Sequence, residues 1–306
     1  MPLNLPFSQP RNYPRAASLA LVAFAAWVVS DALLKLARTQ GVALGEILLI
    51  CGTGGMVVIL LVSSLRGKID HLRPHRPKGL LVLGMCQLMA FACWMMALPH
   101  LPLANMYVVS FLTPMAVACM AAVILKESLG WKRAAAIATG FAGVVITVNP
   151  ANLFQSGGTW LPYLFLFGHM TLSATQMFLL RVVADKEKSE CTAFYPRGIV
   201  ALGGLVICGL TGTAAMKPWV FLILCASGAL GGIGWALIAE AYKNAPAAAV
   251  APFQYSQIIC GALLGYLFWS DVPSVYLLCG SAIIIASGLV LVRQERRASR
   301  MMVRVE

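Results

Sequence analysis

Two residues of opposite charge lie four positions apart in an otherwise apolar stretch, FAAWVVSDALLKLA at positions 24–37. Asp31 and Lys35 would lie about one turn apart on one face of a helix. One interpretation is an ion pair in which the Lys35 side chain extends towards lipid headgroups. The other is that the pair lines a polar pathway and engages the ammonium and carboxylate of an amino acid.

Uncharged polar side chains also interrupt long apolar segments elsewhere. Gln254 and Gln257 are three positions apart, so they would share a helix face, with Tyr255 between them. Such groups either line a cavity for a hydrogen-bonding substrate or join neighbouring helices. His169 is either a packing residue or a proton-coupling residue, because histidine changes charge near neutral pH. The remaining amide candidates are Gln87 and Gln176.

Several aromatic residues lie well inside apolar segments, although Trp and Tyr usually lie at the headgroup belt of a membrane protein. Deep aromatic rings can stack on a flat or apolar substrate, or they can simply pack between helices. Both interpretations stay open for Trp27, Trp94, Tyr107, Phe111 and Trp235.

The sequence contains no recognisable catalytic or metal-binding set. It has neither HExxH nor GxSxG nor a Walker motif, and its nine cysteines include no CxxC pair. His71 and His75 are four apart but have no acidic or cysteine companions nearby in a metal-ligand pattern. We therefore expect no cofactor and no metal, and an intramembrane enzyme is the less favoured alternative.

The elements that must position these residues are membrane spans. Of the 306 residues, 60% are hydrophobic and 11% charged, whereas a soluble domain is about 45–50% apolar and about 25% charged. Segments that are apolar on all sides over about 20 residues predict transmembrane helices. We expect an all-α integral membrane protein with ten of them, at 16–37, 42–64, 79–98, 102–125, 131–148, 160–183, 192–211, 219–242, 246–269 and 274–292.

The basic residues predict the orientation. With the N-terminus in the cytoplasm, nineteen of the 23 Lys and Arg residues fall on the cytoplasmic side, as the positive-inside rule requires. Both termini are then cytoplasmic, in a bacterial inner membrane. The basic tail at positions 293–304 would face anionic lipid, and no nucleic-acid partner is expected.

The chain also contains a weak internal repeat. An offset of 144 places Ala97 on Ala241, Pro102 on Pro246, Ala104 on Ala248 and Glu127 on Asp271. Each half would hold five spans, an odd number, so the second half must enter the membrane from the opposite face. We expect two inverted five-helix repeats, residues 1–148 and 149–306, an organisation that is characteristic of secondary transporters.

This pattern is similar to the paired EamA-type modules of the drug/metabolite transporter superfamily. In the first half Glu127 is followed by Ala136 and Gly143, and in the second half Asp271 is followed by Gly280 and Ser287 at the same spacing. Within the superfamily the chain most resembles the bacterial exporter of aromatic and other amino acids. Arg197 resembles the family's basic residue in the seventh span.

The resemblance implies a ten-helix bundle whose first, third, fourth, sixth, eighth and ninth helices surround a central cavity. It implies export of aromatic and other neutral amino acids by alternating access. Because the sequence has no Walker motif, we expect the energy to come from the solute gradient or from protons. The alternatives are export of a nucleoside, a sugar derivative or another drug-like metabolite. The expected cavity residues are Trp27, Asp31, Gln87, Trp94, Tyr107, His169, Gln176, Trp235, Gln254 and Tyr255.

Overall fold

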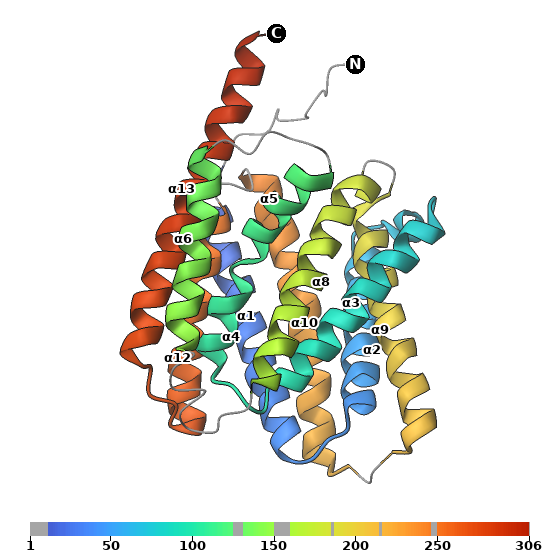
Figure 1. Ribbon diagram of the computed structural model, residues 1–306. Coiled ribbons are helices and arrows are strands. Elements are labelled where there is room, and N and C mark those ends of the chain that lie inside the picture. The colour runs from blue at the N-terminus through green and yellow to red at the C-terminus, as the bar shows by residue number, and fades with distance from the viewer. Residues whose placement is uncertain are drawn as a thin grey trace.

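Every regular element that the computed structural model describes is a helix, which confirms the predicted all-α fold (Figure 1). The structure describes residues 12–124, 131–149, 160–184, 187–213, 216–245 and 250–305. Glu127, Pro246 and Ala248, which carry part of the predicted repeat, lie outside these ranges. The elements are α1 (Tyr13–Thr39), α2 (Leu44–Leu65), η1 (Ile69–Leu72), α3 (Pro77–Ala97), α4 (Leu103–Ser110), α5 (Thr113–Ile124), α6 (Trp131–Val148), α8 (Leu161–Ala184), α9 (Ser189–Thr211), α10 (Pro218–Asn244), η2 (Ala251–Tyr255), α12 (Ser256–Trp269) and α13 (Val275–Val305).

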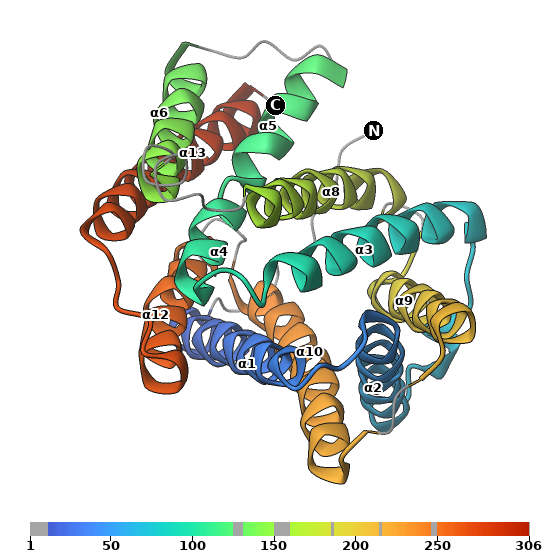
Figure 2. The same cartoon turned by 60° about the horizontal axis from the view of Figure 1, so that its bottom comes forward.

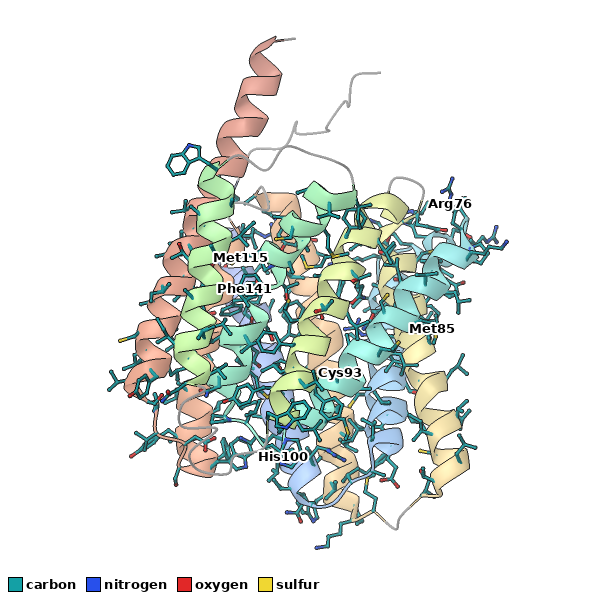
Figure 3. All side chains as sticks on the ribbon, in the orientation of Figure 1. Arg76, Met85, Cys93, His100, Met115 and Phe141 are labelled. Carbon is teal, nitrogen blue, oxygen red and sulfur yellow. The ribbon has the colours of Figure 1, made fainter. Side chains whose placement is uncertain are left out.

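Seven helices in the described part of the chain are long and apolar enough to cross a membrane, and two shorter apolar helices accompany them. The predicted ten spans each overlap one helix or one interrupted pair of helices. The outer surface is correspondingly apolar: Met85 on α3 and Phe141 on α6 are 44% and 39% exposed (Figure 3). Such a surface suits hydrocarbon rather than water.

The fourth and ninth predicted spans are interrupted, each beside a proline. The interruption between α4 and α5 lies next to Pro114, which has no N–H to continue the helix. The carbonyl of Ser110 accepts a hydrogen bond from the Thr113 hydroxyl instead, at 2.6 Å. Pro252 lies in the short 3-10 helix η2 before α12. The two interruptions meet where the rings of Phe111 and Tyr255 pack edge to face, with their centroids 5.2 Å apart.

Helices that are far apart in sequence form the main packing pairs: α1 with α10, α3 with α8, α2 with α9, and α4 with α12. Small residues allow α2 and α9 to approach closely. A Cβ placed on Gly52 would lie 2.7 Å from the backbone nitrogen of Ala201, and one on Gly204 would lie 2.7 Å from the carbonyl oxygen of Gly45. Only glycine fits at these positions without separating the helices.

The helices α6 and α13 pack against each other at the periphery of the bundle, away from α2 and α9 (Figure 2). A Cβ on Gly143 would lie 3.0 Å from the carbonyl oxygen of Gly280. A Cβ on Gly140 would lie 3.1 Å from the Ser287 hydroxyl. The small residues that follow the acidic position in each half therefore have a physical role, because they let these two helices touch.

Candidate functional site

A cavity of about 450 Å³ lies between the two halves of the chain. Side chains from α1, α3, α4, α8, α9 and α10 form most of its wall, with contributions from α2, η2 and α12. Nine of the ten expected residues line it: Trp27, Asp31, Gln87, Trp94, Tyr107, His169, Gln176, Trp235 and Gln254. Tyr255 does not line the cavity and instead packs against Phe111.

Asp31 is the one carboxylate among the described residues that line the cavity. The Tyr107 hydroxyl donates a hydrogen bond to its Oδ2 at 2.6 Å. Trp94 packs against Tyr107 with ring centroids 5.8 Å apart. Asp31 forms no ion pair within the described part of the chain, so no cationic side chain described there contacts its carboxylate.

Lys35 does not pair with Asp31, contrary to the i,i+4 ion-pair interpretation. Its Nζ donates to the carbonyl oxygen of Leu101 at 3.0 Å and lies 3.3 Å from Oδ2 of Asp271. The same ammonium lies 4.8 Å from the centroid of the Trp269 ring. Lys35 is 5% exposed, so these groups replace its lost hydration. It therefore joins the end of α1 to the α3–α4 and α12–α13 connections rather than lining the cavity.

The side chain of His169 is engaged by its neighbours. Its Nδ1 lies 2.9 Å from the carbonyl oxygen of Ala90, which can only accept, so Nδ1 carries the proton. Its Nε2 lies 3.5 Å from the Ser173 hydroxyl, and its ring lies 4.8 Å from that of Trp94. This arrangement is typical of a histidine that fixes the packing of α8 against α3.

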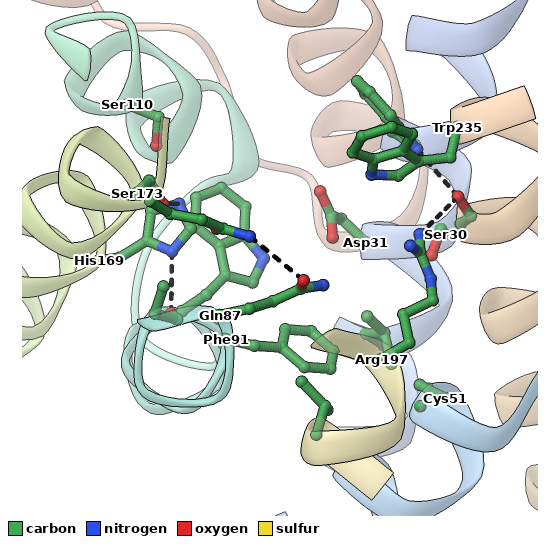
Figure 4. A pocket seen from close by; sticks show the side chains of 18 of the residues that line it. Ser30, Asp31, Cys51, Gln87, Phe91, Ser110, His169, Ser173, Arg197 and Trp235 are labelled. Atoms are coloured by element: carbon green, nitrogen blue, oxygen red, sulfur yellow. Dashed lines mark hydrogen bonds between the residues drawn. The ribbon is translucent and has the colours of Figure 1, made fainter. Parts of the chain in front are cut away.

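Two amide side chains also connect α8 to α3 beside the cavity. Gln176 Nε2 donates to Gln87 Oε1 at 3.2 Å and so joins α8 to α3. Gln254 and Gln257 both line the cavity, as their spacing predicts, although Gln257 is largely buried. Gln87 and His169 lie on one side of the cavity, opposite Asp31 (Figure 4).

Arg197 on α9 also lines the cavity, and it was not among the expected cavity residues. Its Nη2 donates to the carbonyl oxygen of Gly231 at 3.0 Å, and the Trp27 indole donates to the same oxygen at 3.3 Å. The seventh helix was not expected to surround the cavity. The sequence feature that could have identified Arg197 is a lone arginine in an apolar span, because such a charge usually faces a cavity.

A second set of polar contacts lies at the start of α9, involving Glu187 just before the helix and Glu190 in its first turn. Glu187 accepts hydrogen bonds from the backbone N–H groups of His75, at 2.7 Å, and Arg76. Glu190 lies 3.3 Å from His71 Nδ1 and 3.8 Å from Lys68 Nζ. The connection between α8 and α9 is thereby held against the connection between α2 and α3.

A multi-pass helical bundle with a polar, aromatic-walled cavity between its halves is typical of a membrane transporter for small molecules. The sequence profile of the EamA-like transporter family matches residues 14–149 and 160–293. The chain belongs to this family, which is part of the drug/metabolite transporter superfamily. It is a multi-pass membrane transporter and not the intramembrane enzyme that the sequence left as an alternative.

Relatives with different named substrates resemble the chain at similar identity. An S-adenosylmethionine uptake transporter of Rickettsia felis is 24% identical over 79% of this chain and 80% of its own. A riboflavin transporter of Rhizobium johnstonii is 24% identical over 75% and 74%. A pseudopaline exporter of Pseudomonas aeruginosa is 24% identical over 91% and 96%. These three names differ from the amino-acid exporter that the sequence most resembled.

The fold is also similar to a solved structure. A crystal structure with 21% sequence identity superposes with a TM-score of 0.61 over 92% of this chain and 98% of the other. At this identity the likeness concerns the fold alone.

Proposed function

We propose that the protein exports amino acids, or metabolites that contain an amino-acid group, across the bacterial inner membrane. The observation that carries this proposal is Asp31, a carboxylate that lines the cavity and forms no ion pair with any residue the structure describes. An ammonium group of a solute would supply the missing positive charge. Trp27, Trp94 and Trp235 supply apolar surface on which the rest of the solute can stack.

The relatives support this substrate class in part. S-adenosylmethionine, named for the Rickettsia relative, has an amino-acid end joined to a flat purine. Both parts would find partners in a cavity with a carboxylate and indole rings. The relatives that are named for their direction of transport include both an uptake transporter and an exporter. We propose export because the sequence resembles the bacterial exporter of aromatic and other amino acids.

We also propose that residues 1–148 and 149–306 are inverted repeats with both termini in the cytoplasm. The family profile matches once in each half. The helix contacts support the repeat, since α1 packs on α10 as α3 packs on α8, and α2 packs on α10 as α9 packs on α3. The asymmetric distribution of basic residues supports the orientation.

In alternating access, two sets of polar contacts would lie at the two ends of the cavity. The contacts of Lys35 lie on the proposed external side, and those of Glu187 and Glu190 lie on the proposed cytoplasmic side. For alternating access, one of these two sets would separate while the other stays formed. Protons can drive the cycle if Asp31 exchanges a proton for the solute's ammonium group.

A second candidate is a neutral, flat metabolite such as a nucleoside or a flavin. The aromatic wall favours it, and so does the riboflavin transporter among the relatives. Such a solute would use the indole rings and the amides of Gln87, Gln176 and Gln254, and would not need the charge of Asp31.

The discriminating experiment is a counterflow panel in proteoliposomes, with labelled phenylalanine, methionine, S-adenosylmethionine, riboflavin, adenosine and a sugar. Each solute is tested with and without a pH gradient. The proposal expects saturable counterflow of at least one amino-acid-containing solute, with stimulation by protons on the receiving side. Counterflow of riboflavin or adenosine alone would establish the second candidate instead. No counterflow of any member of the panel would refute both.

A further inference from the structure

Arg197 presents a guanidinium group to the cavity, and residues that the structure describes use only a small part of its hydrogen-bonding capacity. A guanidinium has five N–H donors. In the structure one of them donates to the carbonyl oxygen of Gly231 at 3.0 Å. Figure 4 shows the Arg197 guanidinium on the same side of the cavity as Asp31, opposite Gln87 and His169. The remaining donors are available to a bound molecule.

The positive charge of Arg197 is also not neutralised within the described part of the chain. Its guanidinium forms none of the ion pairs found there, and the cavity carboxylate of Asp31 binds the Tyr107 hydroxyl instead. Two opposite charges that line one cavity would normally attract each other into contact. A charge in a membrane-spanning segment is costly unless a partner or water stabilises it. Asp31 and Arg197 form no ion pair with each other, which leaves each of them available to a ligand group of opposite charge.

The surroundings of Arg197 hold its side chain in place. Gly55 of α2 packs directly against it, and a Cβ at that position would lie 2.6 Å from its Cδ. The absence of a side chain at Gly55 therefore makes the groove in which Arg197 lies. Together with the hydrogen bond to Gly231, this groove fixes the guanidinium before a ligand arrives. A fixed guanidinium can bind a carboxylate through two parallel hydrogen bonds.

We infer that Arg197 binds the carboxylate of the solute whose ammonium group Asp31 binds, so that the transporter selects zwitterions over the corresponding amines. This inference rests on the proposed function and names its substrate class more narrowly. The charges support a carboxylate over a phosphate. One negative and one positive side chain match a solute of zero net charge, whereas a phosphate dianion would leave excess negative charge beside Asp31.

The test compares two solutes that differ only in the carboxylate, phenylalanine and phenethylamine, in counterflow assays of the wild type and Arg197→Gln. Arg66→Gln is the matched control, since Arg66 lies outside the cavity and is 3.7 Å from Glu240. We expect Arg197→Gln to weaken the apparent affinity for phenylalanine about 10- to 100-fold, the usual range for a lost charge-assisted hydrogen bond. Phenethylamine transport should change less than about threefold, and Arg66→Gln should resemble the wild type.

Equal loss for both solutes, or no loss for either, would overturn the role of Arg197. Arg197→Lys tests the same point if Arg197→Gln does not reach the membrane. Lysine keeps the charge but not the paired donors, so the loss should again be confined to phenylalanine and be smaller. If the wild type transports neither solute nor any other amino-acid-containing member of the panel, the proposed function fails. If the wild type transports phenylalanine and the Arg197 variants do so equally well, only this inference fails.

Discussion

Replacing Asp31 with asparagine is expected to lower counterflow of amino-group-containing solutes about 10- to 100-fold. An asparagine oxygen can still accept the hydrogen bond that the Tyr107 hydroxyl donates at 2.6 Å, so the local packing should survive. The variant loses only the negative charge. A hydrogen bond to a charged group contributes about 1.5–3 kcal/mol, which corresponds to that range of affinity. Initial counterflow rates in proteoliposomes, at several solute concentrations, measure the effect.

The matched control is Asp70→Asn, because Asp70 is an exposed aspartate whose side chain lies 3.5 Å from Arg73, away from the cavity. It should transport at the wild-type rate. A neutral solute such as riboflavin, if the wild type carries it, should be transported by Asp31→Asn about as well as before. If Asp31→Asn transports an amino acid at the wild-type rate, the Asp31 carboxylate does not bind the solute.

Replacing Gly204 with alanine is expected to destabilise the protein strongly. A Cβ there would lie 2.7 Å from the Gly45 carbonyl oxygen and 2.9 Å from the Leu48 carbonyl carbon. These are backbone atoms of α2 and cannot move aside as a flexible side chain can. Overpacking of this kind costs about 1–3 kcal/mol. The thermal unfolding midpoint in detergent should fall by several degrees, on the order of the shift expected for this free energy.

Gly209→Ala is the control in the same helix, since a Cβ on Gly209 meets no atom within 4 Å. Its unfolding midpoint should be unchanged or slightly higher, because alanine favours the helical state more than glycine does. Equal midpoints for the two variants would show that α2 and α9 are not packed as closely as the structure places them.

The spans could be predicted from sequence because hydropathy reports directly which segments suit hydrocarbon. The helix interruptions beside Pro114 and Pro252 were harder to predict from the sequence. A proline inside an apolar span indicates a kink, but not that α4 and α5 separate or that η2 precedes α12. The partner of Lys35 could not be predicted either. Asp271 lies 236 positions away in the chain, and only the packing of the halves brings the two together.

Most candidate cavity residues could be found from sequence for one physical reason: polar groups in apolar spans avoid lipid and face the interior. That rule places Asp31 and Gln254 correctly but does not separate binding from packing, as the hydrogen bonds of His169 illustrate. It fails for Tyr255, whose ring is directed towards Phe111 by the 3-10 turn. Arg197 satisfies the rule, and it was missed because no role had been assigned to the seventh helix.

The central claim is that the solute binds in the cavity, and Gly231 offers the most direct measurement of it. Gly231 lines the cavity, and a Cβ there would meet no atom within 4 Å, so Gly231→Leu should fill the cavity without disturbing the helices. The measurement is equilibrium binding of the labelled amino acid that the counterflow panel identifies. The proteins are purified wild type, Gly231→Leu and, as a control outside the cavity, Gly209→Leu.

We predict saturable binding by the wild type and by Gly209→Leu. We predict loss of binding by Gly231→Leu at an unchanged unfolding midpoint. If a correctly folded Gly231→Leu protein binds the amino acid with wild-type affinity, the solute does not bind in this cavity.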